Sequence, residues 1–274
     1  MVVRTGRSAF LSLLLAGAIA AFAQTPTATA PLQTEGMQGL EGAKKLMQQQ
    51  LGWDLTAAMG KAKLIAKERS RTKGDQGTVI RYDLVTEGLP QDQHYTLVMW
   101  PLNGGIQPVK SGISLTEDGR LICTGKTTAD CSPNRPDADP IIDMSLTSAK
   151  GEAKRFGLIS EDQKMKALVS LVAFPNKGTD AGCTLEVLRV TPEAEALMIR
   201  GKGFPANAEL PMTSDSDGEV VSGLWHTTDK GDLVTLVMPA VRGKTSGQVT
   251  VRVKAPACTP QVSFPWGKGT YHPE

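Results

Sequence analysis

A repeated alternation of short β-type segments and polar turns most strongly limits what this chain can fold into. Residues 79–86 are rich in β-branched and aromatic side chains and place one set of them on each face of an extended chain. The turn-forming stretch 88–92 ends this segment, and residues 95–100 form a second strand-like run. Further turn signals occur at Asn103-Gly-Gly105 and Asp118-Gly119. Strands this short at this spacing predict an all-β protein built from sandwiches or barrels.

The strand-like segments fall into two groups separated by a polar, loop-forming stretch at 175–182, which we interpret as a domain boundary. The first strand, around Ala62 to Ala66, has a helix as its alternative. The other predicted strands of the first group are 79–86, 95–100, 113–115, 120–123, 141–146, 155–159 and 165–174. Those of the second group are 185–190, 196–201, 209–213, 219–225, 233–238 and 248–253.

The first 23 residues have the pattern of a secretory signal peptide. Arg4 and Arg7 form a short basic region, residues 9–22 are mostly apolar, and Ala21-Phe-Ala23 fits the cleavage rule, so Gln24 is the expected mature terminus. A retained anchor is the alternative. No later stretch is long and apolar enough for a membrane span. We therefore expect a secreted or periplasmic protein that has no stable membrane span after signal cleavage.

Residues 24–60 are expected to be a disordered tether followed by a short helix. Residues 24–39 are rich in Thr, Pro, Ala, Gln and Gly. Residues 41–59 carry apolar side chains at spacings of three and four, which favours an amphipathic helix interrupted near Gly52-Trp53. This helix either leans on the first domain or frays, or it docks a partner.

The charge balance gives no sign of a nucleic-acid or anionic-membrane partner. Loss of Arg4 and Arg7 with the signal reduces the 30 basic residues to 28, which equals the 28 acidic residues. A neutral surface of mixed sign lacks the basic footprint that such partners require.

The four cysteines predict disulfides in an exported chain. We favour the pairs Cys123–Cys131 and Cys183–Cys258, because each bridge then stays within one predicted domain. The second bridge closes a loop of about 75 residues, which contributes about 4 kcal/mol in the chain-entropy model. A thiolate metal site is disfavoured because the spacings do not match those of zinc ligands.

Two local patterns resemble those of immunoglobulin-like β-sandwiches. Leu89-Pro90 followed by Tyr95 is similar to the tyrosine corner of these folds, whose hydroxyl bonds to upstream backbone. Val190-Thr-Pro192, a short apolar strand and Gly201-Lys-Gly-Phe204 resemble the opening of an IPT/TIG-type domain of bacterial exported proteins. The resemblance implies two Ig-like antiparallel β-sandwich domains, at 61–175 and 183–274, of a kind that usually binds, spaces or displays.

The sequence offers no catalytic or metal-binding constellation. His94, His226 and His272 have no second histidine at metal-ligand spacing, and no Gly-x-Ser-x-Gly elbow occurs. Asp215, Asp217 and Glu219 alternate as calcium ligands can, but the pattern is also that of an ordinary β-turn, which we favour. We therefore expect neither an enzyme nor a cofactor.

Three aromatic residues, Phe264, Trp266 and Tyr271, are the candidate binding residues. They lie within eight positions of a chain that is only 5% aromatic. Exposed, they would stack on a glycan or anchor a protein partner; buried, they would cap the second sandwich, which we favour because Cys258 ties this segment to the domain.

These observations favour a non-enzymatic binding or structural protein at the cell envelope or outside the cell. One alternative is an accessory protein of a carbohydrate-active or proteolytic system with a site between the domains, which would show as a cleft holding two or more carboxylates. Another is a subunit of an envelope assembly that uses an open sheet edge.

Overall fold

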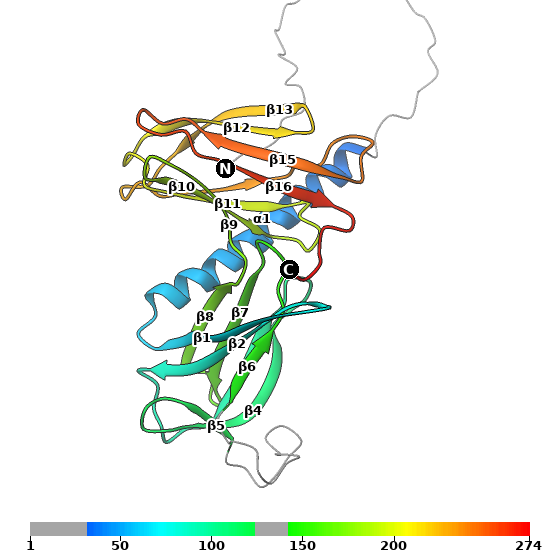
Figure 1. The fold of residues 1–274 in the computed structure, drawn as a ribbon. Helices are drawn as coiled ribbons and strands as arrows, with labels where there is room; N and C mark the ends of the chain where they lie inside the picture. The colour runs from blue at the N-terminus through cyan, green and yellow to red at the C-terminus, as the bar shows by residue number, and fades with distance from the viewer. Residues whose placement is uncertain (1–31, 124–141) are drawn as a thin grey trace, which may run out of the picture.

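The structure is a computed structural model that describes residues 32–123 and 142–274. Within these residues one helix precedes sixteen strands, so the protein is mostly β (Figure 1). The elements are α1 (Leu32–Met59), β1 (Lys63–Gly74), β2 (Gly77–Glu87), β3 (Tyr95–Trp100), β4 (Gln107–Leu115), β5 (Leu121–Cys123), β6 (Asp143–Leu146), β7 (Ala153–Ser160), β8 (Lys166–Val172), β9 (Asn176–Asp180), β10 (Cys183–Arg189), β11 (Leu197–Lys202), β12 (Glu209–Ser216), β13 (Glu219–His226), β14 (Leu233–Val237), β15 (Ser246–Val253) and β16 (Gln261–Gly267).

The N-terminal unit is one eight-stranded sheet, sheet A, with strand order β5-β4-β3-β7-β8-β1-β2-β6. Alternation along β2 explains its inner face: Ile80, Tyr82 and Leu84 are buried while Arg81 is exposed. The buried side of the sheet encloses a single apolar core, to which other strands contribute Leu64, Tyr95, Leu97, Ile113, Leu121, Phe156 and Leu158.

Sheet A curls until its two ends nearly meet. Val85 in β2 forms a β-bridge with Arg120 beside β5, and the Ile142 N–H donates to the Leu121 carbonyl at 2.8 Å. Gly119 has φ +78°, and an added Cβ would lie 2.2 Å from the Thr86 carbonyl oxygen, so this approach requires glycine. The sequence resemblance implied a sandwich of two sheets here, whereas the chain forms one sheet that is close to a barrel.

The C-terminal unit has two four-stranded sheets with one core between them. Sheet B has the order β14-β11-β10-β9, and sheet C has the order β13-β12-β15-β16. The predicted disulfide Cys183–Cys258 is present and links the start of β10 to the β15–β16 loop. Phe204, which follows the Gly201-Lys-Gly segment, is buried in this core.

Two strands of this unit were not predicted. The stretch interpreted as a boundary loop contains β9, which pairs with β10 along its whole length. The Asn176 amide donates to the Ser263 carbonyl at 2.7 Å, and Gly178 lies so close to Gln261 that an added Cβ would meet its carbonyl oxygen at 1.7 Å. The other strand, β16, contains the aromatic patch near the C-terminus.

Helix α1 is longer than predicted and has no interruption. It begins at Leu32, inside the expected tether, and continues through Gly52 without a break. The predicted signal peptide and residues 24–31 lie outside the described residues.

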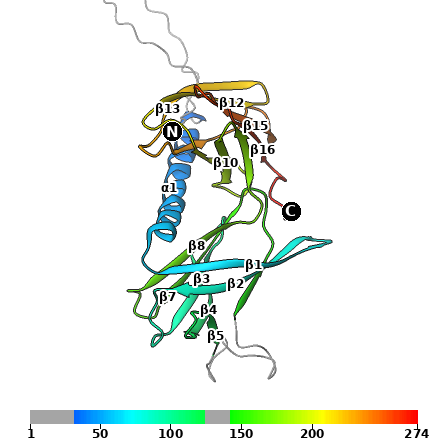
Figure 2. The same ribbon diagram turned by 60° about the vertical axis from the view of Figure 1, so that its left-hand side comes forward.

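The helix runs along both units and packs on each (Figures 1 and 2). Near the middle of the helix, Ala43 and Met47 pack on Leu188 and Met198 of sheet B. In its second half Trp53 packs on the sheet A side chains Val98 and Leu168. The helix thus contacts the molecule's own two units, which extends the predicted contact with the first domain.

Candidate binding groove between α1 and sheet A

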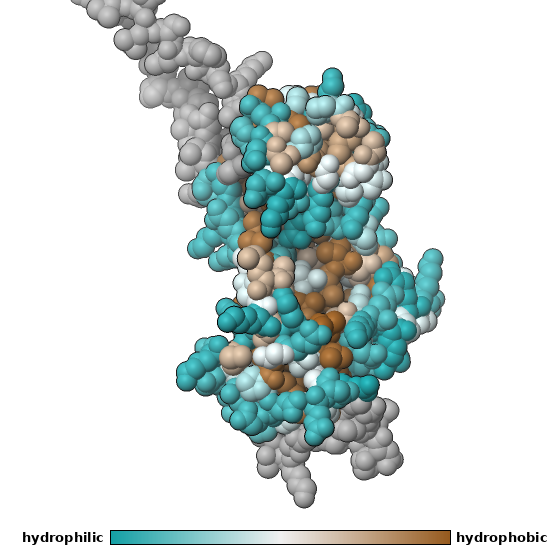
Figure 3. All heavy atoms as spheres, turned by 90° about the vertical axis from the view of Figure 1, so that its left-hand side faces the viewer, coloured by the Kyte–Doolittle hydropathy of each residue, from teal (hydrophilic) through white to brown (hydrophobic). Residues whose placement is uncertain are grey.

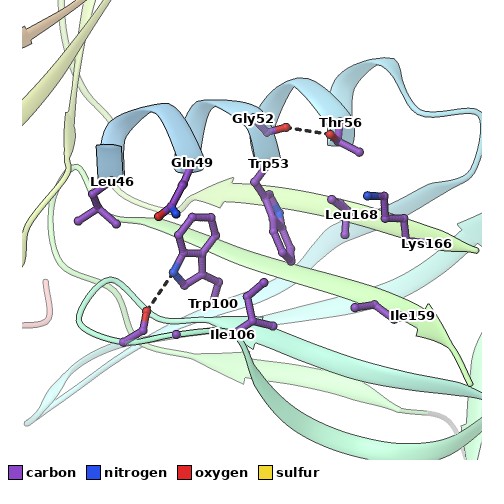
Figure 4. A pocket seen from close by; sticks show the side chains of 12 residues that line it. Leu46, Gln49, Gly52, Trp53, Thr56, Trp100, Ile106, Ile159, Lys166 and Leu168 are labelled. Carbon is purple, nitrogen blue, oxygen red and sulfur yellow. Dashed lines mark hydrogen bonds between the residues drawn. The ribbon is translucent and has the colours of Figure 1, made fainter. Parts of the chain in front are cut away.

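An open apolar groove of about 590 Å³ lies between the second half of α1 and one face of sheet A (Figure 4). Figure 3 shows hydrophobic side chains gathered in a hollow across the middle of this side of the molecule. The apolar side chains that line the groove come from the helix, from β3 and the following loop, and from β7 and β8: Leu46, Trp53, Trp100, Ile106, Ile159 and Leu168.

Two tryptophans dominate the groove. The rings of Trp53 and Trp100 meet edge to face, with their centroids 5.8 Å apart and their planes at 60°. Trp53 Nε1 donates to the Val169 carbonyl at 3.2 Å, and Trp100 Nε1 donates to the Gly104 carbonyl at 3.0 Å. Because both indole N–H groups are committed to backbone, the rings offer a ligand apolar surface only.

The loop after β3 forms one wall. The sequence predicted its turn from Asn103-Gly-Gly105, and the Gly104 carbonyl accepts the hydrogen bond from Trp100 Nε1. Ile106, the last residue before β4, lines the groove although its side chain is 54% exposed. Ile106 thus extends the apolar surface of the groove, and contiguous apolar surfaces of this kind mark candidate binding sites.

Polar side chains occur only at the edges of the groove. Figure 4 shows Gln49 and Lys166 toward opposite ends, and Lys166 pairs across strands with Ile159. The third polar lining residue is Thr56. Its hydroxyl donates to the Gly52 carbonyl of the same helix at 2.8 Å. Among the described lining residues there is no carboxylate, histidine, serine or cysteine.

A buried ion cluster holds the helix over the groove. Asp54 accepts from Arg155 of β7 at 2.9 and 3.1 Å and also from Arg200 of β11. The Arg155 side chain is only 2% exposed, and its guanidinium lies 5.7 Å from the centre of the Trp100 ring. One carboxylate on α1 thus connects sheet A, sheet B and an aromatic ring of the groove.

The aromatic residues proposed from the sequence do not form an exposed surface. Phe264 and Trp266 are 1% and 2% exposed in the core of the C-terminal unit, because alternation along β16 points both of them inward. A binding platform made of all three aromatics is therefore not formed. Tyr271 is 37% exposed and lies beyond the strand.

Tyr271 instead closes the junction between the two units. Its hydroxyl donates to Glu152 at 2.9 Å, and Glu152, which is 1% exposed, also accepts from Lys154 at 2.7 Å. Burial first, and then the charge and hydrogen bond of Glu152, raise the pKa of Tyr271 above its ordinary value. Arg189 lies over the Phe264 ring at 4.8 Å and donates to the Thr270 carbonyl at 2.7 Å.

The histidines lie apart from one another and from the groove. His94 Nδ1 is 3.2 Å from the Ser114 hydroxyl, and His226 is a largely exposed residue 3.9 Å from Glu209. His272 is exposed. Among the residues that the structure describes, no group of three or more His, Cys, Asp and Glu side chains has the arrangement of a metal site.

The acidic segment 215–219 makes a hairpin turn between β12 and β13. Asp215 accepts from the Gly218 N–H at 2.9 Å, and Asp217 and Gly218 have positive φ. The hydrogen bond from the Gln248 backbone N–H, together with Lys244, lowers the pKa of Asp217. Asp215 therefore serves the turn, in agreement with the turn interpretation of the sequence, and Asp217 connects the turn to Lys244 and Gln248.

Cys123, at the end of β5, is disulfide-bonded, while its predicted partner Cys131 lies outside the described residues. The one described helix is not both long and apolar enough to span a membrane.

The groove residues were missed because they are far apart in the sequence. Trp53 and Trp100 are two of only four tryptophans, and they come from a helix and from a strand in different parts of the chain. The local sequence feature that could have indicated the groove was Ile106, an apolar residue directly after a turn.

Comparisons with known proteins do not assign the chain to a family. No protein-family model and no curated protein matches it. Among solved structures, a crystal structure of a tetra-tandem repeat in the extending region of a large adhesion protein is similar at 12% sequence identity and a TM-score of 0.26. The match covers 75% of this chain and 49% of that chain, so this chain spans about half of the length of that protein. A similarity of this extent does not establish a shared fold or function.

Proposed function

We propose that this protein is an exported, non-catalytic binding protein whose ligand occupies the groove between α1 and sheet A. The observation that carries the proposal is the groove itself: Trp100, the exposed Ile106 and the largely buried Trp53 line an open apolar groove that no described side chain covers. Export is supported by the signal-peptide pattern of residues 1–23 and by the disulfide Cys183–Cys258, which forms in oxidising compartments.

The lining favours an apolar ligand over a glycan. A sugar requires hydrogen-bonding groups around a flat aromatic platform, whereas Trp53 and Trp100 meet at 60° and their N–H groups are already bonded. Lys166 is the only charged residue among the described residues of the lining, so an apolar group that carries a negative charge at one end is the best match. Such a group belongs to an amphiphile or to an apolar side chain near a carboxylate.

The alternative of an enzymatic accessory site between the domains has less support. Two carboxylates near the unit junctions, Asp54 and Glu152, are buried against cations and hydrogen-bond donors. Neither carboxylate lines the groove. A buried carboxylate that is ion-paired in this way is typical of a structural role.

The test uses anilinonaphthalene sulfonate, an aromatic probe with a negative charge, and follows its fluorescence during titration of the exported protein. Ile106→Asp places a charge on the apolar wall, so we expect affinity for the probe to fall by about tenfold or more. Val109→Asp is the matched control, because Val109 is 52% exposed on β4 but does not line the groove.

Equal thermal stability of the two variants would show that the fold is intact in both. Unchanged probe affinity in Ile106→Asp, or an equal loss in Val109→Asp, would contradict the groove as the binding site.

A further inference from the structure

We propose that the protein forms a twofold-symmetric dimer in which β13 pairs antiparallel with β13 of a second copy, with the two Ser222 residues facing each other on the axis. This interface is independent of the groove. It rests on the position of β13, on its exposed side chains and on their order along the strand.

Strand β13 is the outer strand of sheet C and pairs only with β12 among the described strands (Figure 1). That pairing is regular from Glu219 to His226, without a bulge. The opposite side of β13 therefore presents a straight row of backbone N–H and C=O groups, which is the feature that binds another strand.

The other outer strands are shorter or are protected. β5, β6, β9 and β14 have three, four, five and five residues. β16 contains Pro265, and it packs along β9 through the contact of Gly178 with Gln261. By contrast, β13 has eight residues and no proline or lysine, and residues 220–225 carry no charge. Outer strands of soluble proteins that remain unpaired are usually short or carry a proline, a lysine or another charged residue.

The exposed side chains of β13 favour a second copy as the occupant. Val220 and Leu224 are 61% and 59% exposed, while Trp225 points into the core. Since side chains alternate along a strand, Val220, Ser222 and Leu224 share the solvent face. Two large apolar residues are thus placed symmetrically on either side of a small polar one.

This order is self-complementary in antiparallel pairing. With Ser222 on the twofold axis, Val220 lies opposite Leu224 of the second copy, and Leu224 lies opposite Val220 of the second copy. Two identical apolar cross-strand pairs form on the same face, and the two copies of sheet C become one continuous eight-stranded sheet. The register follows from the alternation, because a shift by one residue would place Val220 opposite a core-facing residue.

The test is sedimentation velocity of the exported protein over micromolar to millimolar concentrations. We expect the wild type to dimerise. Val220→Lys with Leu224→Lys places lysine opposite lysine in both pairs, so we expect dimerisation to weaken by about 30-fold or more.

Val220→Glu with Leu224→Lys places glutamate opposite lysine in both pairs, and we expect it to dimerise at low salt and to dissociate as salt is raised. Val234→Lys changes an exposed residue of the outer strand β14 and should dimerise like the wild type. Far-UV circular dichroism checks that each variant is folded.

A wild type that remains monomeric at the highest concentration would overturn the proposal. Dimerisation that survives the double-lysine change would do the same. A glutamate–lysine variant as weak as the double-lysine variant would overturn the register. None of these outcomes depends on probe binding in the groove, so the two proposals can fail separately.

Discussion

At the scale of single residues, local patterns predicted local contacts correctly. The Tyr95 hydroxyl donates to the Pro90 carbonyl at 2.6 Å, as the resemblance to a tyrosine corner implied. The sheet around it is nevertheless a near-barrel. A bond between residues five positions apart needs only a turn before a buried strand, so it is compatible with several folds and does not determine which strands become neighbours.

This bond gives a prediction for stability. Tyr95 itself is fully buried and its hydrogen bond to Pro90 is partly buried, so Tyr95→Phe removes this bond and leaves the ring in place. We expect the free energy of unfolding to fall by about 1–2 kcal/mol, measured by denaturant titration.

Tyr82→Phe is the matched control. Tyr82 is buried in the same core, and its hydroxyl has no hydrogen bond to another described residue. Tyr82→Phe should lower the free energy of unfolding by less than Tyr95→Phe does. Equal costs would show that the bond to Pro90 contributes nothing measurable.

At the scale of elements, α1 is the element whose role depends most on distant parts of the chain. Glycine inside a helix costs about 1 kcal/mol, which is why Gly52 indicated an interruption. The helix continues because Met47 before that point and Trp53 after it are both buried against sheets. Burial of either side chain contributes about 1.5–3 kcal/mol and outweighs the glycine.

The ion cluster on α1 gives the prediction at this scale. Asp54→Ala leaves Arg155 buried without its carboxylate partner, and we expect the free energy of unfolding to fall by about 3–5 kcal/mol. Leu55→Ala, at the neighbouring position and 50% exposed, should change it by less than about 1 kcal/mol. Chemical denaturation of both variants provides the measurement. A small loss in Asp54→Ala would mean that Arg155 finds solvent or another partner.

At the scale of the whole molecule, the two units are joined through the helix, the short segment between β8 and β9, and the residues after β16. The Glu274 N–H donates to the Ser148 carbonyl at 3.1 Å, and the Glu274 carbonyl accepts from Thr78 of β2. Together with the Tyr271–Glu152 bond, these contacts bring the C-terminal residues back onto the N-terminal unit.

Tyr271 makes this junction sensitive to alkaline pH. Its pKa is raised in the folded state, so its stabilising contribution is present below the ordinary tyrosine pKa near 10 and is lost as pH rises above it. We expect Tyr271→Phe to lose less stability than the wild type as pH rises from about 10 to 11.

The melting temperature across this range measures the effect. Tyr82 and Tyr95 remain in the variant and are also shifted upward by burial, so part of the alkaline loss should persist. Identical pH profiles for the variant and the wild type would rule out a contribution of Tyr271 to the junction.

The sequence by itself determined the mostly β class, most strand positions and the turns at Asn103-Gly-Gly105 and Asp118-Gly119, and it favoured the pair Cys183–Cys258, which the structure confirms. These follow from alternation, turn chemistry and cysteine placement, which act over short distances or leave few alternatives. In β16, Val262, Phe264 and Trp266 alternate with Gln261 and Ser263, so this strand could also have been predicted.

Tertiary structure alone decided the curling of sheet A, the path of α1 along both units and the groove. Each of these depends on which distant segments pack together: Trp53 meets Trp100, and Asp54 meets both Arg155 and Arg200. Such contacts are set by the total burial and pairing of the folded chain, and no short stretch of sequence contains that information.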